Sequence, residues 1–217
     1  MALWVLVPVK PFREGKSRLA SVLNPQERER LNRWLLRHVL ETLRQVPEVF
    51  RVLVISRDPA VLSMARELDA QTLQESGAPG LNETLTRAVH LLEPRGLRRA
   101  LVLPADLPLL TPQDVQALIQ ALHASPLAGE APLMVIAPDR HHSGTNALLL
   151  DPVQGHRFAF GPGSFIHHIR QARQQGRFVQ VVERPGLSYD LDHPHDLDLV
   201  RHVFPQWAVR AVVGSHS

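Results

Sequence analysis

The chain has 217 residues, 44% of them hydrophobic, which is typical of one α/β domain with a single large core. It has no cysteine, which excludes disulfides, thiolate metal ligands and cysteine nucleophiles. The formal net charge is only +3 although the pI is 10.1, because nearly all the cations are arginines. These arginines are interspersed with acids along predicted helices, which argues against nucleic-acid binding.

The N-terminal ten residues contain a short apolar run with no basic region before it and no cleavage site after it. They predict a buried strand and not a signal peptide. No apolar stretch approaches the roughly 20 residues that a membrane span requires. We therefore expect a cytoplasmic protein with no membrane or nucleic-acid partner. The oligomeric state stays open, a homodimer included.

Strand and helix signals alternate from end to end. Apolar runs predict strands at Leu3–Val9, Arg51–Ile55, Gln71–Gln74, Arg99–Leu103, Leu133–Ala137, Thr145–Leu150, Val179–Val182 and Leu187–Leu191. Cap signals predict helix starts at Asn24-Pro25, Asp58-Pro59, Asn82-Glu83 and Thr111-Pro112, and a further helix over about 164–174. This alternation predicts a single α/β domain over 1–217, with a mainly parallel sheet, helices on both faces and a small antiparallel addition that forms a lid or subdomain. Ligands bind such sheets at the carboxyl ends of the strands.

Positive charge concentrates directly after the first predicted strand. Residues 10–18 hold four cations, including Lys10 and Lys16, which are the two lysines of the chain, and a glycine that allows close backbone approach. Fixed cations and free N–H groups suit a triphosphate, although the spacing is not that of a Walker A loop. An arginine-rich chain also places cations in loops by chance. Lys16 lies in a polar stretch, so we expect Lys16→Ala to change stability by less than about 0.5 kcal/mol.

Aspartates mark two further strand ends. Asp106 lies in LPADLPL, on a loop stiffened by two prolines, and suits either an oxygen ligand to magnesium or a turn. Asp190 and Asp192 are two apart in an extended segment, so they project to the same side and repel unless a cation or a proton lies between them. Asp192 is alternatively a helix N-cap, and Asp196 is assigned a structural role in the first helical turn.

Two glycine-containing segments precede predicted helices. FGPGSF at 160–165 would seat a carboxylate or phosphate at a helix N terminus, and Gly80 with Asn82 would contact an anion or a base. Both segments are also compatible with a simple turn or cap. The 12 histidines include no metalloprotease spacing, and no G-x-S-x-G elbow supports a serine nucleophile.

The segments VPVKPFxxGKSRL, LPADLPL, GTN, FGPGSF and YDLDHPHDL, in this order from about Val7 to Leu197, resemble the 2-phospho-L-lactate and phosphoenolpyruvate guanylyltransferases. That family makes an early intermediate of coenzyme F(420) and has a GT-A-like nucleotidyltransferase fold. DLDxPxDL alone also resembles the molybdenum-cofactor guanylyltransferases. Those relatives usually begin with a glycine-rich loop, so the lysine-containing loop here favours the phospho-acid enzymes.

The resemblance implies transfer of GMP from GTP to phosphoenolpyruvate or 2-phospho-L-lactate, with Mg²⁺ as cofactor and diphosphate as product. Position by position, it assigns the metal to Asp106, Asp190 and Asp192, the phospho-acid to Thr145, Gly161 and Ser164, the triphosphate and its charge neutralisation to Lys10, Lys16 and Arg18, and further nucleotide contacts to Gly80 and Asn82. Two rival functions remain at this stage. One is another GT-A nucleotidyltransferase, of the molybdenum-cofactor or sugar-phosphate type, and the other is a non-catalytic nucleotide-binding module.

Overall fold

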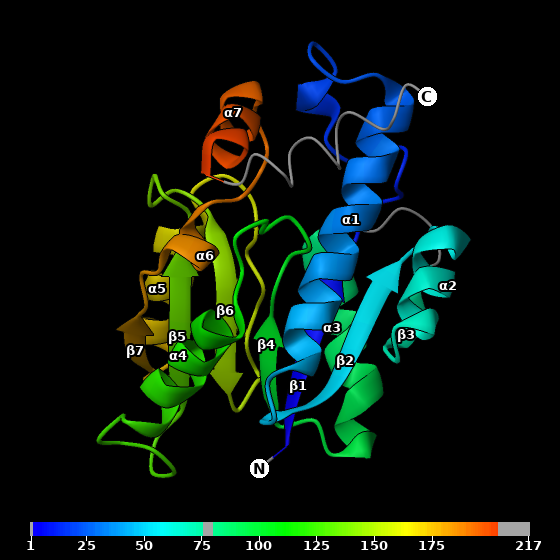
Figure 1. Cartoon of the computed structure of the whole chain (residues 1–217). Coiled ribbons are helices and arrows are strands. Elements are labelled where there is room, and N and C mark those ends of the chain that lie inside the picture. Colours follow the sequence, from blue (N-terminus) through cyan, green and yellow to red (C-terminus); the bar gives the residue numbers. More distant parts are fainter. Residues whose placement is uncertain (1, 76–79, 204–217) are drawn as a thin grey trace.

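A computed structural model describes residues 2–75 and 80–203, with side chains as far as Asp198. Its strands form one seven-stranded sheet in the order β3-β2-β1-β4-β6-β5-β7 (Figure 1). The strands are β1 (Leu3–Pro8), β2 (Val49–Ser56), β3 (Gln71–Gln74), β4 (Arg99–Val102), β5 (Leu133–Pro138), β6 (Thr145–Asp151) and β7 (Phe178–Val181). Neighbouring strands pair in parallel, except that β6 runs antiparallel to both β4 and β5.

The predicted α/β fold with a mainly parallel sheet is therefore confirmed. The antiparallel part differs from the expectation, because β6 lies inside the main sheet and forms no lid. Its reversed direction has a consequence for function. The first residues of β6, Thr145 and Asn146, lie at the same edge of the sheet as the carboxyl ends of its neighbours.

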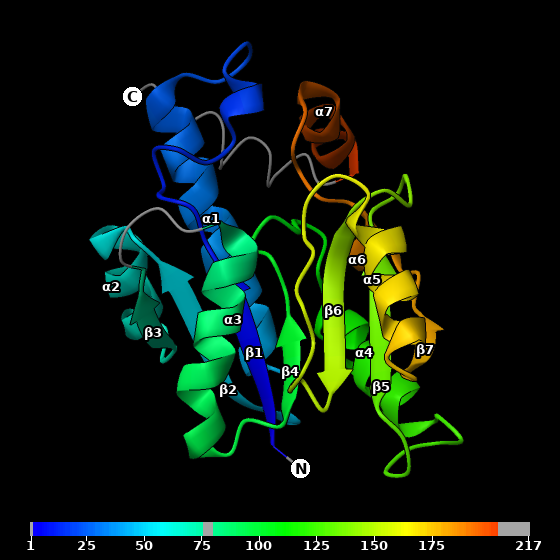
Figure 2. The same cartoon turned by 180° about the vertical axis from the view of Figure 1, so that it is seen from behind.

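Helices cover both faces of the sheet, as the alternation predicted. They are α1 (Pro25–Arg44), α2 (Pro59–Glu67), α3 (Leu81–Leu92), α4 (Pro112–His123), α5 (Ser164–Gln174), α6 (Pro185–Ser188) and α7 (Pro194–Val203), with 3₁₀ turns η1 (Ser17–Leu19) and η2 (Glu93–Arg95). Figure 1 shows α1, α4 and α6 in front of the sheet, and Figure 2 shows α3 and α5 on the opposite face.

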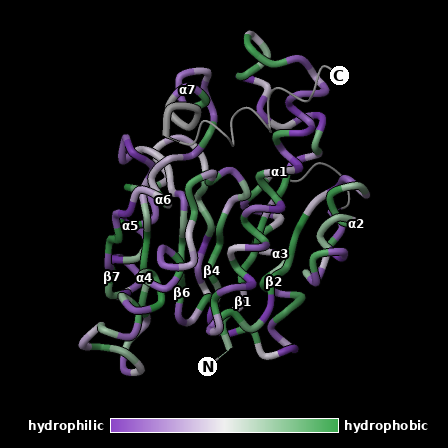
Figure 3. The backbone as a smooth tube through the Cα atoms, in the orientation of Figure 1, coloured by the Kyte–Doolittle hydropathy of each residue, from purple (hydrophilic) through white to green (hydrophobic). Residues whose placement is uncertain are grey.

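Alternate residues of each strand supply the two cores between these layers. In β1, Val5 and Val7 pack with α1, α2 and α4, whereas Trp4 and Leu6 pack with α3 and α5. Such period-2 alternation, apolar on both faces, is what a central strand between two helical layers requires. The hydrophobic stretches of the central strands stand out along the backbone in Figure 3.

Two predicted helix starts have the expected hydrogen bonds. Asn24 and Glu27 form a reciprocal capping box at the start of α1, and Thr111 and Asp114 form another at α4. The expected start of α3 at Asn82-Glu83 is wrong. Gly80 is the N-cap, and Asn82 is already the second helical residue, which frees its side chain for a long-range contact.

The expected strand Leu187–Leu191 is also wrong. Pro185 begins the short helix α6 there, and an irregular segment follows it. The two leucines that suggested a strand serve different hydrophobic clusters. Leu187 belongs to the core between the sheet and α4, and Leu191 packs with Leu31 and Leu35 of α1, so the two leucines do not share one strand face.

No helix within residues 2–75 and 80–203 is both long and apolar enough to cross a membrane.

Candidate functional site

Above the carboxyl edge of the sheet lie η1, α7 and the N-terminal end of α1 (Figure 1). A separate apolar cluster holds these segments together. Leu19 and Leu23 from the η1 segment and Leu31 and Leu35 of α1 pack against Leu191 and Leu197. The cation-rich loop and the Asp190–Asp192 segment are therefore fixed relative to each other by burial, although they lie at opposite ends of the chain.

Lys16 connects the cation-rich loop after β1 to two distant acidic segments, one containing Asp106 and the other containing Asp192. Its Nζ lies 3.0 Å from Asp106 Oδ2 and 3.0 Å from Asp192 Oδ1, and its side chain is only 7% exposed. Burial works to lower the pKa of Lys16, but the charges and hydrogen bonds of Asp106 and Asp192 raise it above its usual value. The sequence placed Lys16 in a polar stretch, but its side chain is nearly buried and paired with two carboxylates, so Lys16→Ala is now expected to cost stability.

The backbone of the acidic segment is also tied to Asp106. Leu191 N donates to the Asp106 carbonyl at 3.0 Å, which places Asp190 and Asp192 on either side of that contact. Asp196 accepts from the backbone N–H groups of Asp192 and His193 at 2.8 and 2.6 Å and pairs with Arg140. Asp196 therefore has the structural role predicted for it. These contacts orient the 190–192 segment so that its two carboxylates face Asp106 and Lys16.

The three site aspartates differ in charge environment. Burial raises the pKa of Asp190, the nearby charges of Asp106 and Asp192 raise it further, and Asn146 Nδ2 donates to its Oδ1 at 3.4 Å. Asp192 behaves oppositely: burial alone would raise its pKa, but Lys16 and Arg18 lower it, with Arg18 Nη1 at 3.2 Å. Asp190 is thus the carboxylate with the least compensating positive charge.

Asp106, Asp190 and Asp192 are the residues that the sequence predicts as metal ligands. Among the described residues, no three His, Asp or Glu side chains lie close enough together to hold a metal ion without rearrangement. The ammonium of Lys16 lies between Asp106 and Asp192. Asp106 Oδ1, however, is buried and has no hydrogen-bond partner. An orphaned carboxylate oxygen beside an undercompensated Asp190 fits the binding of a hard cation, and the donor set of oxygens is the one that Mg²⁺ prefers.

A buried polar network lies on the other side of the site, at the start of β6 and α5. Ser164 Oγ donates to Thr145 Oγ1 at 3.1 Å, and Thr145 Oγ1 lies 3.1 Å from His168 Nδ1. His168 Nε2 accepts the N–H of Ala159 at 3.0 Å. The sequence had paired Thr145 with Ser164 only through the resemblance, and the structure brings the two hydroxyls into contact.

The glycine turn beside this network needs its glycines. Gly161 has φ 138° and Gly163 has φ 73°, both in the region that favours glycine. Asn82 holds the turn in place, since its Oδ1 accepts from Phe160 N at 2.7 Å and its Nδ2 donates to Phe160 O at 3.0 Å. Asn82 therefore links α3 to the glycine turn instead of standing free, whereas Gly80 is exposed at the N terminus of α3.

Lys10, the other lysine, is exposed and has no ion pair among the described residues. Arg18 is 63% exposed, and Asp192 is its partner. Lys10 and Arg18 thus present positive charge towards solvent, whereas the charge of Lys16 is held inside by carboxylates.

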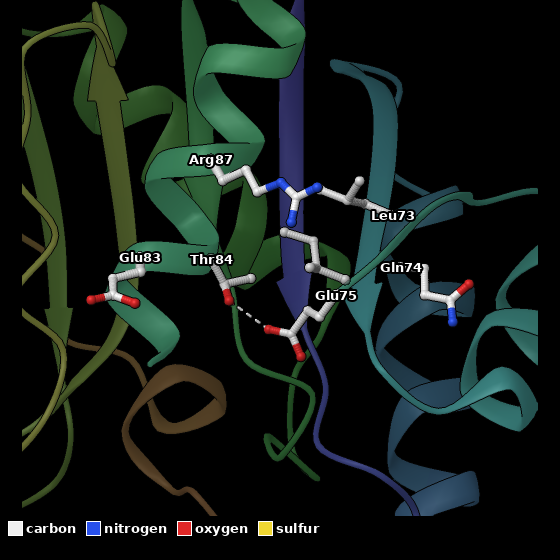
Figure 4. A pocket seen from close by; sticks show the side chains of 7 residues that line it. Leu73, Gln74, Glu75, Glu83, Thr84 and Arg87 are labelled. Atoms are coloured by element: carbon white, nitrogen blue, oxygen red, sulfur yellow. Dashed lines mark hydrogen bonds between the residues drawn. The ribbon is translucent and has the colours of Figure 1, made fainter. Parts of the chain in front are cut away.

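A cavity of about 300 Å³ lies at the same edge of the sheet, between the ends of β2 and β3 and the start of α3 (Figure 4). It is lined by Ile55, Leu73, Gln74, Glu75, Glu83, Thr84 and Arg87. Glu75 Oε1 accepts a hydrogen bond from Thr84 Oγ1 at 2.6 Å, which fixes the carboxylate at the cavity wall. The lining thus combines apolar Ile55 and Leu73 with the carboxylates of Glu75 and Glu83 and the guanidinium of Arg87.

Sequence reasoning gave no role to Asn146, His168 or Glu75. Asn146 is adjacent to a residue that the resemblance selected, but its contact with Asp190 depends on the direction of β6. His168 was one of several paired histidines with no distinguishing spacing. Glu75 follows a weak strand and has no motif around it, so no sequence signal would have identified it.

Comparison with known proteins agrees with this geometry. The family described as Guanylyl transferase CofC like matches residues 3–203. A phosphoenolpyruvate guanylyltransferase from Rubrobacter xylanophilus is 47% identical, covering 91% of this chain and 92% of the relative. A 2-phospho-L-lactate guanylyltransferase from Methanothermobacter thermautotrophicus is 36% identical, covering 93% of this chain and 86% of the relative.

Solved structures show the same fold at low sequence identity. A protein from Desulfovibrio desulfuricans superposes with TM-score 0.75 at 16% identity, covering 97% of this chain and 91% of that one. The 4-diphosphocytidyl-2C-methyl-D-erythritol synthase of Anaerococcus prevotii superposes with TM-score 0.62 at 10% identity, covering 94% and 96%. The family match and the identity to the curated relatives lead to one conclusion: this chain belongs to the CofC-like guanylyl transferase family.

Proposed function

We propose that this protein transfers GMP from GTP to phosphoenolpyruvate or 2-phospho-L-lactate and releases diphosphate, a step in coenzyme F(420) biosynthesis. The observation that carries the proposal is the Lys16 ammonium held between Asp106 and Asp192, beside an undercompensated Asp190. A buried set of alternating charges at a sheet edge suits phosphoryl chemistry, where positioning and charge neutralisation supply most of the rate enhancement. The names of the relatives point to the same reaction.

In this reaction a phosphate oxygen of the acid attacks the α-phosphorus of GTP in line, and diphosphate leaves from the opposite side. The attacking oxygen is already ionised near neutral pH, so the reaction requires no general base. Lys16, whose pKa is raised, stays protonated and offsets negative charge that grows on the leaving diphosphate. The exposed charges of Lys10 and Arg18 would attract the triphosphate and hold its outer phosphates.

Asp106, Asp190 and Asp192 would hold Mg²⁺. Bound there, the ion would supply positive charge that offsets the negative charge of the phosphoryl oxygens. The contribution of the chain is to keep three oxygen donors together, through the Leu191–Asp106 backbone contact and the hydrogen bond from Asn146 to Asp190.

Thr145, Ser164 and Gly161 would bind the phospho-acid. The hydroxyls of Thr145 and Ser164 are fixed by their mutual contact, and the glycine turn allows backbone N–H groups to approach an anion. Gly80 at the start of α3 would contact the nucleotide, and Asn82 would act there by holding the turn at Phe160.

The choice of guanine is supported by the cavity in Figure 4. Guanine presents N1–H and its 2-amino group as donors on one edge, where adenine presents an acceptor nitrogen. A carboxylate only accepts, so Glu75 at the wall of this cavity favours guanine over adenine. Apolar Ile55 and Leu73 would contact the flat face of the base.

Diphosphate release tests the proposal directly. The purified protein is incubated with GTP and Mg²⁺ in separate reactions, each with one acceptor: phosphoenolpyruvate, 2-phospho-L-lactate, 3-phosphoglycerate, a sugar phosphate or molybdopterin. We expect diphosphate release and a GMP-linked acid with phosphoenolpyruvate or 2-phospho-L-lactate. Release only with a sugar phosphate or molybdopterin would support the rival enzyme classes. Binding of GTP without any acceptor reacting would support a non-catalytic module.

A further inference from the structure

His168 is fully buried beneath Thr145 and Ser164, and its surroundings determine which ring nitrogen carries hydrogen. Ala159 N–H points at Nε2 over 3.0 Å, and because a backbone N–H only donates, Nε2 must present a lone pair. Burial and then the charge of His167 lower the pKa of His168 to about 4, so the ring is neutral at pH 7. Its one ring hydrogen is therefore on Nδ1, from where it donates to Thr145 Oγ1 over 3.1 Å.

This tautomer decides what the two hydroxyls offer a ligand. Thr145 and Ser164 together have two hydroxyl hydrogens, and one of these lies in the 3.1 Å contact between them. If Ser164 donates to Thr145, the Thr145 hydrogen is left over; if Thr145 donates to Ser164, the Ser164 hydrogen is left over. With Nδ1–H donating to the pair, one O–H always remains without an acceptor among the described residues.

The opposite tautomer gives the opposite result. Nδ1 would then accept the Thr145 hydrogen, Ser164 would donate to Thr145, and only oxygen lone pairs would face a ligand. Lone pairs repel an anion. In the described part of the chain, neither hydroxyl has another hydrogen-bond acceptor, so the remaining hydrogen is left for a group outside the protein. Leaving a buried donor unpaired costs free energy, which an anionic ligand oxygen would recover.

We propose that His168 is a positioning residue for the phospho-acid substrate, whose Nδ1–H fixes the Thr145–Ser164 pair as a hydrogen-bond donor to an anionic substrate oxygen. The inference rests on the proposed function for the identity of the ligand. His168 itself does not touch the substrate. It acts through Thr145, in the way that outer-shell partners orient the groups that bind a ligand.

A neighbouring residue provides a matched control. His156 is also buried, and its ring lies 5.7 Å from that of His168, but neither of its ring nitrogens has a hydrogen-bond partner among the described residues. His156→Phe removes a buried imidazole next to His168 but leaves the Thr145–Ser164 pair and its hydrogen bonds intact. His168→Leu removes the donor to Thr145, and His168→Asn keeps a side-chain N–H near the Nδ1 position.

The tautomer is measured without reference to activity. In the protein labelled with ¹⁵N in its histidines, we expect the His168 signals to show protonated Nδ1 and unprotonated Nε2 at pH 7, with assignment by loss of the signals in His168→Leu or, if that variant does not fold, in His168→Asn. A ring protonated on Nε2 would overturn the proposal, whether or not any variant retains activity.

Kinetics then test the role. We expect His168→Leu to raise KM for the acid by roughly tenfold or more while KM for GTP changes less than about twofold, since a hydrogen bond to a charged group is lost only on the acid side. His168→Asn should recover part of the loss, and His156→Phe should leave KM for the acid within about twofold. Equal increases in both KM values, or an effect of His156→Phe as large as that of His168→Leu, would mean a merely structural role. Failure of the wild-type protein to react with any acid would overturn the proposed function instead.

Discussion

Lys16 Nζ and Asp106 Oδ2 lie 3.0 Å apart although 90 residues separate them in sequence. Their contact is made by a lysine side chain that is nearly removed from solvent and is shared with Asp192. Since Asp106 and Asp192 share this ammonium, we expect Lys16 to contribute to the stability of the fold at this edge of the sheet. Replacement of Lys16 should therefore affect the free energy of unfolding as well as the reaction with GTP.

We expect Lys16→Ala to lower the free energy of unfolding by about 1–3 kcal/mol, because partly buried carboxylates lose their counter-charge while solvent screens some of the loss. kcat/KM for GTP should fall by roughly tenfold or more. Urea unfolding and initial rates measure the two effects. Lys10→Ala is the control for stability, since exposed Lys10 has no ion pair in the described residues and should stay within about 0.5 kcal/mol. If both variants unfolded at the same urea concentration as the wild type, the bridging role of Lys16 would be excluded.

Asp190→Asn and Asp192→Asn should each lower turnover by roughly two orders of magnitude or more. Their effects on stability should have opposite signs. The raised pKa of Asp190 means that its charged form is disfavoured in the folded state, so Asp190→Asn should stabilise the protein at pH 7. The lowered pKa of Asp192 means that its charge contributes stability above its unfolded pKa, which is lost as pH falls through the folded pKa. Asp192→Asn should therefore destabilise at pH 7.

The exposed Asp69, paired with Arg44, provides the matched control for these two variants. Asp69→Asn should change neither turnover nor its dependence on Mg²⁺ concentration. Rates measured across a magnesium titration, with chelator as the zero point, check the metal assignment. Near wild-type turnover of Asp190→Asn at limiting magnesium would show that this aspartate does not hold the ion.

Glu75→Gln should reduce the preference for GTP over ATP in kcat/KM by roughly tenfold or more, because an amide in place of the carboxylate also donates to adenine N1. Competition between the two nucleotides in the diphosphate assay measures this ratio. Glu83→Gln is the matched control, since Glu83 lines the same cavity but is exposed on α3. An unchanged ratio for Glu75→Gln would exclude this carboxylate as the selector of the base.

Stability should fall as the pH is lowered from 6.5 towards 4, because buried histidines must stay neutral in the folded state. Burial and then the charges of His168 and Arg177 lower the pKa of His156 to about 3, and the pKa of His168 is about 4. In this window the unfolded chain binds protons that the folded chain does not, so each histidine lowers stability by up to about 1.4 kcal/mol per pH unit. Urea unfolding at pH 7.5, 6 and 5 should show a shallower decline for His156→Phe. A decline for His156→Phe as steep as that of the wild type would contradict the prediction.

The sequence by itself determined the α/β layering, since apolar runs and cap signals are local. The N-terminal ends of α1 and α4 follow from the Asn24 and Thr111 capping boxes, where the hydrogen bonds connect residues three apart. The sequence pointed to Asp106, Asp190 and Asp192 through the segments LPADLPL and YDLDHPHDL, although Asp190 and Asp192 follow the short helix α6 and not a strand. These segments could not reveal which cation neutralises the charge of which carboxylate.

Only the tertiary structure decided those relationships. The antiparallel direction of β6 brings Thr145 and Asn146 to the site edge, and the leucine cluster around Leu191 brings Lys16 to Asp106 and Asp192. The hydrogen bond from Ala159 to His168 likewise joins a loop to a helix. Each of these depends on strand pairing or burial between distant segments, where the energy of contact is set by packing and has no local sequence pattern.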